Sequence, residues 1–135
     1  MDFQIAPDSI ELAEAVREYL ADTHGPEVLR RLDAEGNRND DLWQGLAGMG
    51  LAGLLVPEAQ GGLERSLIDA ALIARECGRV CLAEPLVDTA FVAVPWMMAT
   101  GRGDELAEIA TGDRRISLAH IINGWVADGD GAALS

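Results

Sequence analysis

The chain has 135 residues, a hydrophobic fraction of 49% and a formal net charge of −13, from 23 acidic against 10 basic residues. This length and apolar content suit one compact globular unit and exclude a disordered chain. All of the basic residues are arginine, and the strong negative charge argues against nucleic acid or anionic membranes as partners, because both repel an acidic surface.

The sequence carries no sign of a membrane or export segment. No apolar run approaches the length of a membrane span, and the first residues, MDFQIAPDS, lack a basic stretch followed by an apolar one. We therefore expect a cytoplasmic protein that does not enter a membrane.

Apolar residues at helical spacing predict a mainly α fold of about six helices. We expect the helices over residues 9–22, 27–34, 40–49, 66–80, 87–99 and 104–110. Two strands over 115–122 and 125–128, joined at the turn-forming pair Asn123-Gly124, should form a hairpin. We therefore predict a helical domain over 1–112 and the truncated start of a β-domain over 113–135.

The turn His24-Gly25-Pro26 separates the first two helices. Glycine favours the end of a helix, and proline cannot simply continue the backbone hydrogen-bond ladder. His24 is expected to be exposed at this turn. The short helix that follows should turn Val28, Leu29 and Leu32 inward.

The third helix and its exit form the segment around which the chain is organised. Asn39 and Asp40 are suitable N-caps, and Gly50 is well placed to end the helix in the left-handed conformation. Residues 48–53 match G-x-G-x-x-G, but a dinucleotide site needs a strand before this motif and a helix after it. Because the preceding residues are helical and Pro57 follows, we interpret the motif as a helix end and a tight extended crossover.

The fourth helix has the widest apolar surface. Ser66 and Asp69 resemble a capping box at its start, and Leu72 and Ile73 widen its apolar stripe, so we expect a central helix packed on several sides. Its expected inward face comprises Leu67, Ala70, Ala71, Ala74, Cys77, Gly78 and Cys81. We interpret both cysteines as buried thiols, because two thiols cannot build a zinc site and both histidines are distant in sequence.

The segment from Leu86 to Thr100 is helical in pattern but contains Pro95. Proline removes one backbone hydrogen bond and crowds the carbonyl of Phe91, so a kink or break is expected there. Four carboxylates lie near apolar residues, and we expect structural rather than catalytic roles for them: Glu58, Glu64, Glu76 and Glu84. Glu76 should pair with Arg75 or Arg79, and the strand residue His120 is either partly buried or lines a site.

One combined pattern resembles the N-terminal helical domain of the acyl-CoA dehydrogenases. A leucine-rich helix is followed by G-x-x-G-x-x-x-P-E-x-x-G-G and then by a helix ending in E-x-G-R. Here the matching residues are Gly50, Gly53, Pro57, Glu58, Gly61, Gly62, Glu76, Gly78 and Arg79. The resemblance covers residues 1 to about 120, and all of its residues have structural roles.

The resemblance implies an FAD-dependent enzyme that oxidises the α–β bond of an acyl-CoA thioester and passes a hydride to the flavin. It implies acyl-CoA and electron-transfer flavoprotein as partners, within a homo- or hetero-oligomer. The family's catalytic base lies in a later domain, so no catalytic residue and no metal site are expected in this chain. The family's first flavin-contacting pattern, A-x-T-E-P-x-x-G-S, is replaced here by residues 120–124, HIING, which leaves the flavin-binding residues unassigned.

In the family, the helix after E-x-G-R lines the acyl pocket. The resemblance therefore assigns one wall of that pocket to Val87, Ala90, Phe91 and Val94. The alternative is that this face packs in the core. A second class of function also stays open, namely a non-catalytic helical module or accessory subunit that packs on a catalytic partner.

Overall fold

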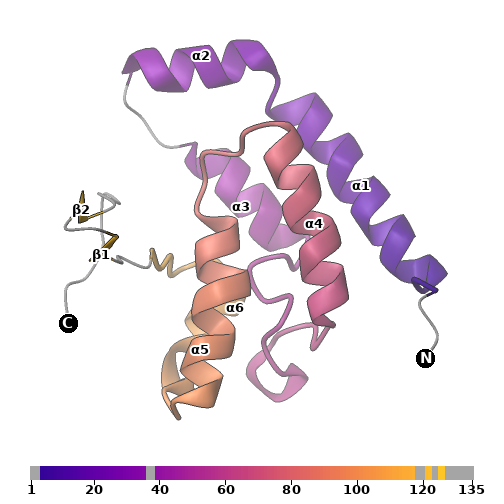
Figure 1. Ribbon diagram of the computed structural model, residues 1–135, viewed down its shortest axis with the longest axis vertical. Helices are drawn as coiled ribbons and strands as arrows, with labels where there is room; N and C mark the ends of the chain where they lie inside the picture. Colours follow the sequence, from indigo (N-terminus) through magenta and orange to yellow (C-terminus); the bar gives the residue numbers. More distant parts are fainter. Residues whose placement is uncertain (1–3, 36–38, 118–120, 123–124, 127–135) are drawn as a thin grey trace. The chain divides into compact units, whose positions relative to one another are not determined.

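The computed structural model describes residues 4–35, 39–117, 121–122 and 125–126, and these residues are mainly helical (Figure 1). The α-helices among them are α1 Pro7–Thr23, α2 Pro26–Glu35, α3 Asp40–Gly48, α4 Leu67–Arg79, α5 Val94–Ala99 and α6 Leu106–Ala110. Shorter elements are the 3-10 helices η1 Glu58–Gln60 and η3 Gly103–Glu105, and the π-helix η2 Val87–Ala93. The mainly α fold is therefore confirmed, and each expected helix is found with its ends within two residues of the prediction.

The chain divides into two compact units. The first comprises Met1–Gly45 and Arg65–Glu84, and the second comprises Leu46–Glu64 and Pro85–Ser135. None of the described helices is both long and apolar enough to cross a bilayer.

Helices α1 and α4 are the packed pair of the first unit (Figure 1). Asp8 and Arg65, beside the first residues of the two helices, are 2.9 Å apart, so both helices begin at the same end of the unit. Their buried apolar residues are Ala13, Val16 and Leu20 on α1 and Ala70, Ile73 and Cys77 on α4. The small side chains among them allow the two helices to approach closely.

Helix α4 differs from the prediction in which of its sides is buried. It begins as expected, with a capping box between Ser66 and Asp69. Leu67 and Ile68, however, are 69% and 57% exposed, and Ala71 and Gly78 are also exposed. The prediction of burial on several sides was therefore wrong: α4 buries one stripe, and that stripe includes the polar residues Asp69 and Glu76.

The exit from α3 follows the predicted pattern of caps and turns. The Asn39 side chain accepts the Leu42 N–H at 3.1 Å, and Gly50 and Gly61 adopt φ of 80° and 83°. Gly62 lies so close to Val56 that a Cβ there would be 2.0 Å from the Val56 carbonyl oxygen. The G-x-G-x-x-G sequence lies on a helix end and turns, so it lacks the flanking strand and helix of a dinucleotide site.

Pro95 changes the type of helix rather than ending it. Residues 87–93 form a π-helix, in which Val94 N–H bonds the Thr89 carbonyl five residues earlier, and α5 continues from Val94. Pro95 lies in the first turn of α5. Its missing N–H costs little there, because the first N–H groups of an α-helix have no partner within that helix. In place of the kink or break expected near Pro95, the structure has a switch from π to α geometry.

The β region is shorter than expected. Residues 115–117 are not in a strand, so the predicted strand over 115–122 was wrong there. Strands β1 Ile121–Ile122 and β2 Trp125–Val126 pair antiparallel, with Ile121 opposite Val126 and Ile122 opposite Trp125. The expected turn at Asn123-Gly124 and the strand histidine His120 lie outside the described residues.

We expect the Ile73→Ala variant to lose about 2–5 kcal/mol of unfolding free energy, the usual range for truncating a buried isoleucine. Ile73 is 1% exposed and belongs to the buried stripe of α4. Chemical denaturation measures the loss. Ile68→Ala is the matched control on the exposed side and should change stability by no more than about 0.5 kcal/mol; equal losses in both variants would contradict this assignment of faces.

We expect Gly62→Ala to destabilise the protein by about 1–3 kcal/mol, because the new methyl group must displace backbone atoms at Val56. Gly78→Ala is the opposite case, since nothing lies within 4 Å of its added Cβ in α4. It should stabilise by roughly 0.5–1 kcal/mol through the better helix propensity of alanine. Thermal or chemical unfolding of both variants would reveal the opposite signs, and a stable Gly62→Ala protein would show that the approach of the two segments is not required.

Candidate functional site

The expected acyl-pocket wall lies on η2 and at the start of α5. Ala90 and Val94 are fully buried, Val87 is 37% exposed, and Phe91 is half-buried. A π-helix has more residues per turn than an α-helix, so positions that share one face at α spacing are spread around η2. The structure therefore groups Val87 with Phe91 towards the open side and turns Ala90 and Val94 into the core.

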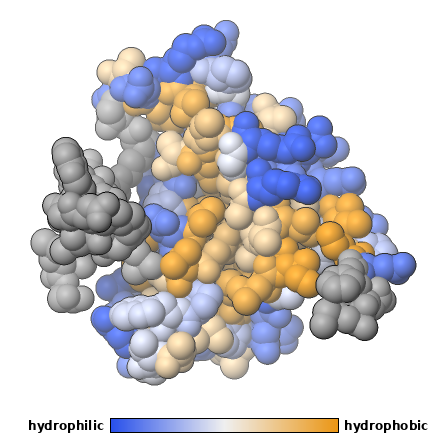
Figure 2. Space-filling model, viewed as in Figure 1, coloured by the Kyte–Doolittle hydropathy of each residue, from blue (hydrophilic) through white to orange (hydrophobic). Residues whose placement is uncertain are grey.

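Further large apolar side chains of η2 and α5 are also exposed. Val92, Trp96 and Met98 are 45%, 48% and 46% exposed. The Arg102 guanidinium lies 5.6 Å from the centre of the Trp96 ring, a cation–π contact that holds the indole at the surface. Figure 2 shows that apolar side chains lie beside strongly polar ones on the face in view. These exposed apolar side chains can contact an apolar group of a ligand.

On the buried side of η2, Thr89 makes the most distinctive polar contact of the second unit. Its side chain is fully buried, its hydroxyl donates to the Ile116 carbonyl at 2.7 Å, and the hydroxyl oxygen accepts the Ile116 N–H at 3.0 Å. One side chain thus satisfies both backbone groups of a residue 27 positions away. Sequence reasoning did not single out Thr89; the available signal was a hydroxyl in the buried stripe of an apolar helix, which must find a partner.

A second anchor holds the same segment two residues earlier. The Arg114 N–H bonds the Glu108 carbonyl at 3.1 Å, and the Arg114 guanidinium lies 3.2 Å from Glu105 and 3.3 Å from Glu108. These ion pairs are largely exposed and therefore weak. The segment 113–117, which precedes β1, is thus tied both to α6 and to η2.

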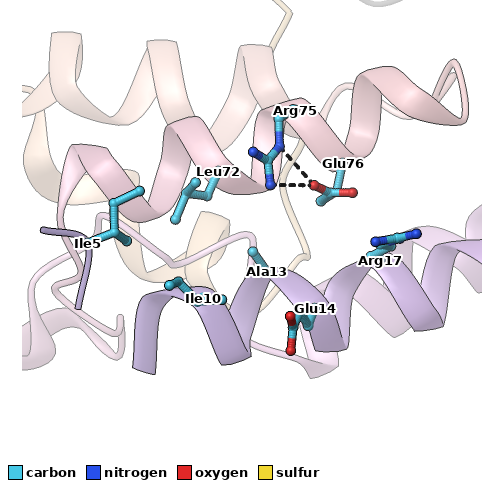
Figure 3. A pocket seen from close by; sticks show the side chains of 8 residues that line it. All are labelled: Ile5, Ile10, Ala13, Glu14, Arg17, Leu72, Arg75 and Glu76. Atoms are coloured by element: carbon cyan, nitrogen blue, oxygen red, sulfur yellow. Dashed lines mark hydrogen bonds and ion pairs between the residues drawn. The ribbon is translucent and has the colours of Figure 1, made fainter. Parts of the chain in front are cut away.

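Helices α1 and α4 enclose a shallow hollow of about 260 Å³ in the first unit (Figure 3). It is lined by Ile5, Ile10, Ala13, Glu14, Arg17, Leu72, Arg75 and Glu76. The Arg75 Nε donates to Glu76 at 2.9 Å, and Arg79 Nε lies 3.3 Å from the same carboxylate, so the expected pairing of Glu76 is confirmed. Acidic and basic groups balance around an apolar base, which gives the hollow no net preference for a charged ligand.

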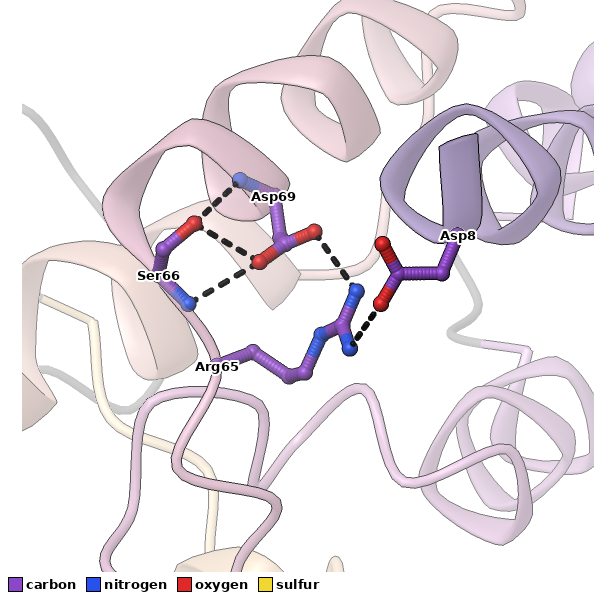
Figure 4. A network of polar contacts seen from close by, with 4 residues as sticks. All are labelled: Asp8, Arg65, Ser66 and Asp69. Atoms are coloured by element: carbon purple, nitrogen blue, oxygen red, sulfur yellow. Dashed lines mark hydrogen bonds and ion pairs between the residues drawn. The ribbon is translucent and has the colours of Figure 1, made fainter. Parts of the chain in front are cut away.

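A buried carboxylate organises the shared end of α1 and α4 (Figure 4). Asp69 is 4% exposed and accepts bonds from the Ser66 hydroxyl and N–H at 2.7 and 2.9 Å and from Arg65 at 3.0 Å. Burial by itself raises the pKa of Asp69, but hydrogen bonds from Ser66, Ser9 and Arg65 outweigh that effect and lower the pKa from 3.8 to about 2. Asp69 therefore stays ionised and serves as a structural group rather than a proton donor.

Two of the other three carboxylates that the sequence singled out also have structural contacts. Glu64 accepts the Glu58 N–H at 3.1 Å across the turn, while Glu58 itself is exposed. Glu84 is 5% exposed and accepts the Asn39 N–H at 2.7 Å, which ties the start of α3 to the segment after α4. Each contact fixes backbone, as expected for residues without a catalytic role.

Two predictions about titratable side chains need correction. His24 was expected to be exposed but is 2% exposed, and neither ring nitrogen has a hydrogen-bond partner among the described residues. Of the two cysteines, Cys77 is buried and Cys81 is exposed, with a positive φ of 50° just after α4. Burial, reinforced by the charge of Glu76, raises the pKa of the Cys77 thiol to about 11, so this thiol is inert.

Metal chemistry finds no support in the described part of the chain. Among these residues, no group of three or more His, Cys, Asp or Glu side chains could hold an ion. The candidate site is therefore the apolar wall formed by η2 and α5, together with the hydroxyl anchor behind it.

Comparison with known proteins places the chain among acyl-CoA dehydrogenases. The family profile described as "Acyl-CoA dehydrogenase, N-terminal domain" matches residues 6–103. Acyl-CoA dehydrogenase IpdE2 of Mycolicibacterium smegmatis and that of Mycobacterium tuberculosis are 30% and 33% identical over 123 and 125 residues. These alignments cover 87% of this chain but only 39% of each relative, so the chain spans well under half of their length.

Solved structures give the same fold. The ChsE4-ChsE5 complex from Mycobacterium tuberculosis has a TM-score of 0.77 and 22% identity, covering 88% of this chain and 34% of that one. A variant of the Tcur3481-Tcur3483 steroid ACAD has a TM-score of 0.71 and 31% identity, covering 82% of this chain and 31% of that one. The matched parts confirm a helical domain of the acyl-CoA dehydrogenase type.

We expect the stability that Asp69 contributes to depend on pH. Because the folded-state pKa is depressed, this contribution is complete above pH 3.8 and is lost as the pH falls towards about 2. A shift of this size corresponds to about 2 kcal/mol. Unfolding free energies measured at neutral pH and in steps through this window should show the wild type approaching Asp69→Asn at the acidic end.

The matched control is Asp8→Asn, which removes the more exposed partner of Arg65. A surface ion pair of this kind is worth about 0–1 kcal/mol, so the control should keep most of the acid-dependent loss. A wild-type profile parallel to that of Asp69→Asn throughout the window would refute the role of the Asp69 carboxylate.

Proposed function

The chain belongs to the acyl-CoA dehydrogenase family, and from that premise we propose that it forms the N-terminal helical part of a flavin-dependent acyl-CoA dehydrogenase. In this role it contributes one wall of the acyl site and a surface for subunit packing, with acyl-CoA and electron-transfer flavoprotein as partners of the complete enzyme. The carrying observation is the apolar open side of η2 and α5, where the family's acyl-lining helix is expected.

This wall binds the acyl chain and excludes water from it. Val87 and Phe91, with the exposed Val92 beside them, offer apolar surface to an acyl chain, and burying that surface favours binding. Ala90 and Val94 pack behind them and hold the helix in place. A dry apolar wall also strengthens the electrostatic interactions of a reacting thioester held against it.

In the complete enzyme, bound FAD would supply the hydride acceptor. Among the described residues, Arg114 and Ile116, which precede the first strand, are engaged within the second unit by ion pairs and by Thr89, so neither is assigned to a flavin site. The family's flavin-contacting sequence is also replaced at residues 120–124. The flavin-binding residues therefore stay unassigned, and by the family resemblance proton abstraction belongs to a later domain of the complete enzyme.

A steroid-derived acyl group is the substrate class that the comparisons support. One relative of known structure, 31% identical, is a steroid ACAD.

The direct test is an NMR titration of the labelled chain with acyl-CoA at high concentration, and with CoA alone as the matched ligand control. We expect acyl-CoA to shift the amide signals of residues 87–94, and Phe91→Glu to abolish the shifts by placing a charge at the wall. Leu67→Glu, which alters an exposed side chain in the first unit, should leave them intact. Equal responses to CoA and acyl-CoA, or none, would reject an acyl wall here.

We also expect this chain alone to show no dehydrogenase activity and to retain no stoichiometric FAD. Hydride transfer requires substrate, flavin and base to be held together, and one wall of a site cannot achieve this. Absorbance in the flavin bands and oxidation of acyl-CoA with an artificial electron acceptor measure both properties. Tight yellow flavin with turnover would overturn this expectation.

The second candidate function is a non-catalytic accessory subunit that packs on a catalytic partner. The observation favouring it is the exposed apolar surface away from η2, where Leu67 and Ile68 are 69% and 57% exposed and could pack on a partner. An accessory subunit predicts no acyl-dependent shifts at residues 87–94, so the titration separates the two.

A further inference from the structure

The link between Thr89 and Ile116 resembles one rung of a β-ladder made by a side chain. A hydroxyl has one proton to donate and two lone pairs, so it can engage an N–H and a carbonyl at once. Thr89 does so with both polar groups of Ile116, at 3.0 and 2.7 Å, as a neighbouring strand would. Residues 114–117 have no secondary structure of their own, so this contact takes the place of a strand partner.

The position of Thr89 makes this contact strong and specific. The side chain is fully buried, and its helical neighbours on the buried side are Leu86, Ala90 and Ala93. In such a setting a hydrogen bond is not weakened by water, and an unpaired backbone group is costly. The Arg114 ion pairs that hold the same segment are largely exposed, so Thr89 is the more effective of the two anchors.

We propose that the Thr89 hydroxyl is a positioning group that fixes Ile116, and with it the segment leading into β1, to the back of the acyl wall on η2. The inference rests on the proposed function, because it makes η2 the common support of the acyl site and of the β region that follows. An acyl group bound on the open side of η2 restrains the helix, and the Thr89 contact passes that restraint to Ile116. Thr89 touches no substrate; it acts through Ile116.

The first test needs no ligand. Amide hydrogen exchange of Ile116, measured by NMR in the intact chain, should be roughly tenfold faster or more in Thr89→Val, which keeps the shape but removes the hydroxyl. Thr89→Ser keeps the hydroxyl and should restore slow exchange. Thr100→Val, which removes a hydroxyl bonded only within its own helical turn, should leave Ile116 unchanged.

Folding of each variant is checked by circular dichroism, and Thr89→Ala replaces Thr89→Val if the latter does not fold. Unchanged exchange at Ile116 in the folded variant would overturn the anchoring. Failure of Thr89→Ser to restore slow exchange would also overturn it, since the hydroxyl would then not be the active group.

The second test adds acyl-CoA. Binding should slow Ile116 exchange in the wild type and in Thr89→Ser but not in Thr89→Val, and by reciprocity Thr89→Val should bind acyl-CoA more weakly. Shifts at residues 87–94 without any change at Ile116 would overturn the coupling. If acyl-CoA changes neither the shifts nor the exchange of the wild type, both the proposed function and the coupling are overturned. The ligand-free comparison of the variants would still decide whether Thr89 anchors Ile116.

Discussion

The first unit depends on a buried carboxylate placed where two helices begin. Helices α1 and α4 start at the same end, so the positive ends of their macrodipoles lie together, an arrangement that repels itself. Asp69 supplies a full negative charge there, and Asp8 lies in the first turn of α1. Because Arg65 contacts both carboxylates, it joins the two helix starts at the point where the chain returns to the first unit.

The second unit depends on a constraint of a different kind, the absence of one N–H at Pro95. A π-helix before the proline and an α-helix after it allow the chain to pass this residue without a break. The consequence reaches the candidate site, since the π geometry decides which side chains of η2 face outward. The same π-helix contains the buried Thr89, so the segment before Pro95 carries both the exposed and the buried side of the wall.

The sequence predicted helices and caps well because those signals are local. Ser66, Asn39 and Gly50 act within a few residues of themselves, and their roles follow from backbone geometry alone. Apart from the strand expected over 115–122, the wrong predictions concerned tertiary burial. The apolar character of Leu67 does not reveal whether anything covers it, and the Gly-Pro turn beside His24 does not show that the ring points inward.

For the candidate site, the sequence predicted which segment to consider but not which of its side chains are exposed. Helical spacing and family resemblance placed a wall at residues 87–94, but the division of its side chains between surface and core followed from the π-helix, which periodicity cannot distinguish from an α-helix. The Thr89–Ile116 contact spans 27 residues, and no local pattern announces such a pairing. A polar residue in an apolar stripe signals only that some partner must exist.

The residues that carry the family resemblance have a common explanation in the structure. Gly50 is required for its positive φ, Gly62 for its approach to Val56, and Glu76 for its pairs with Arg75 and Arg79. Each of these features is a contact or conformation within the chain that supports its fold. Such a pattern constrains the fold tightly while leaving the open side of η2 free to vary. If the proposed wall binds an acyl group, its specificity would belong to exposed apolar side chains that the shared pattern does not include.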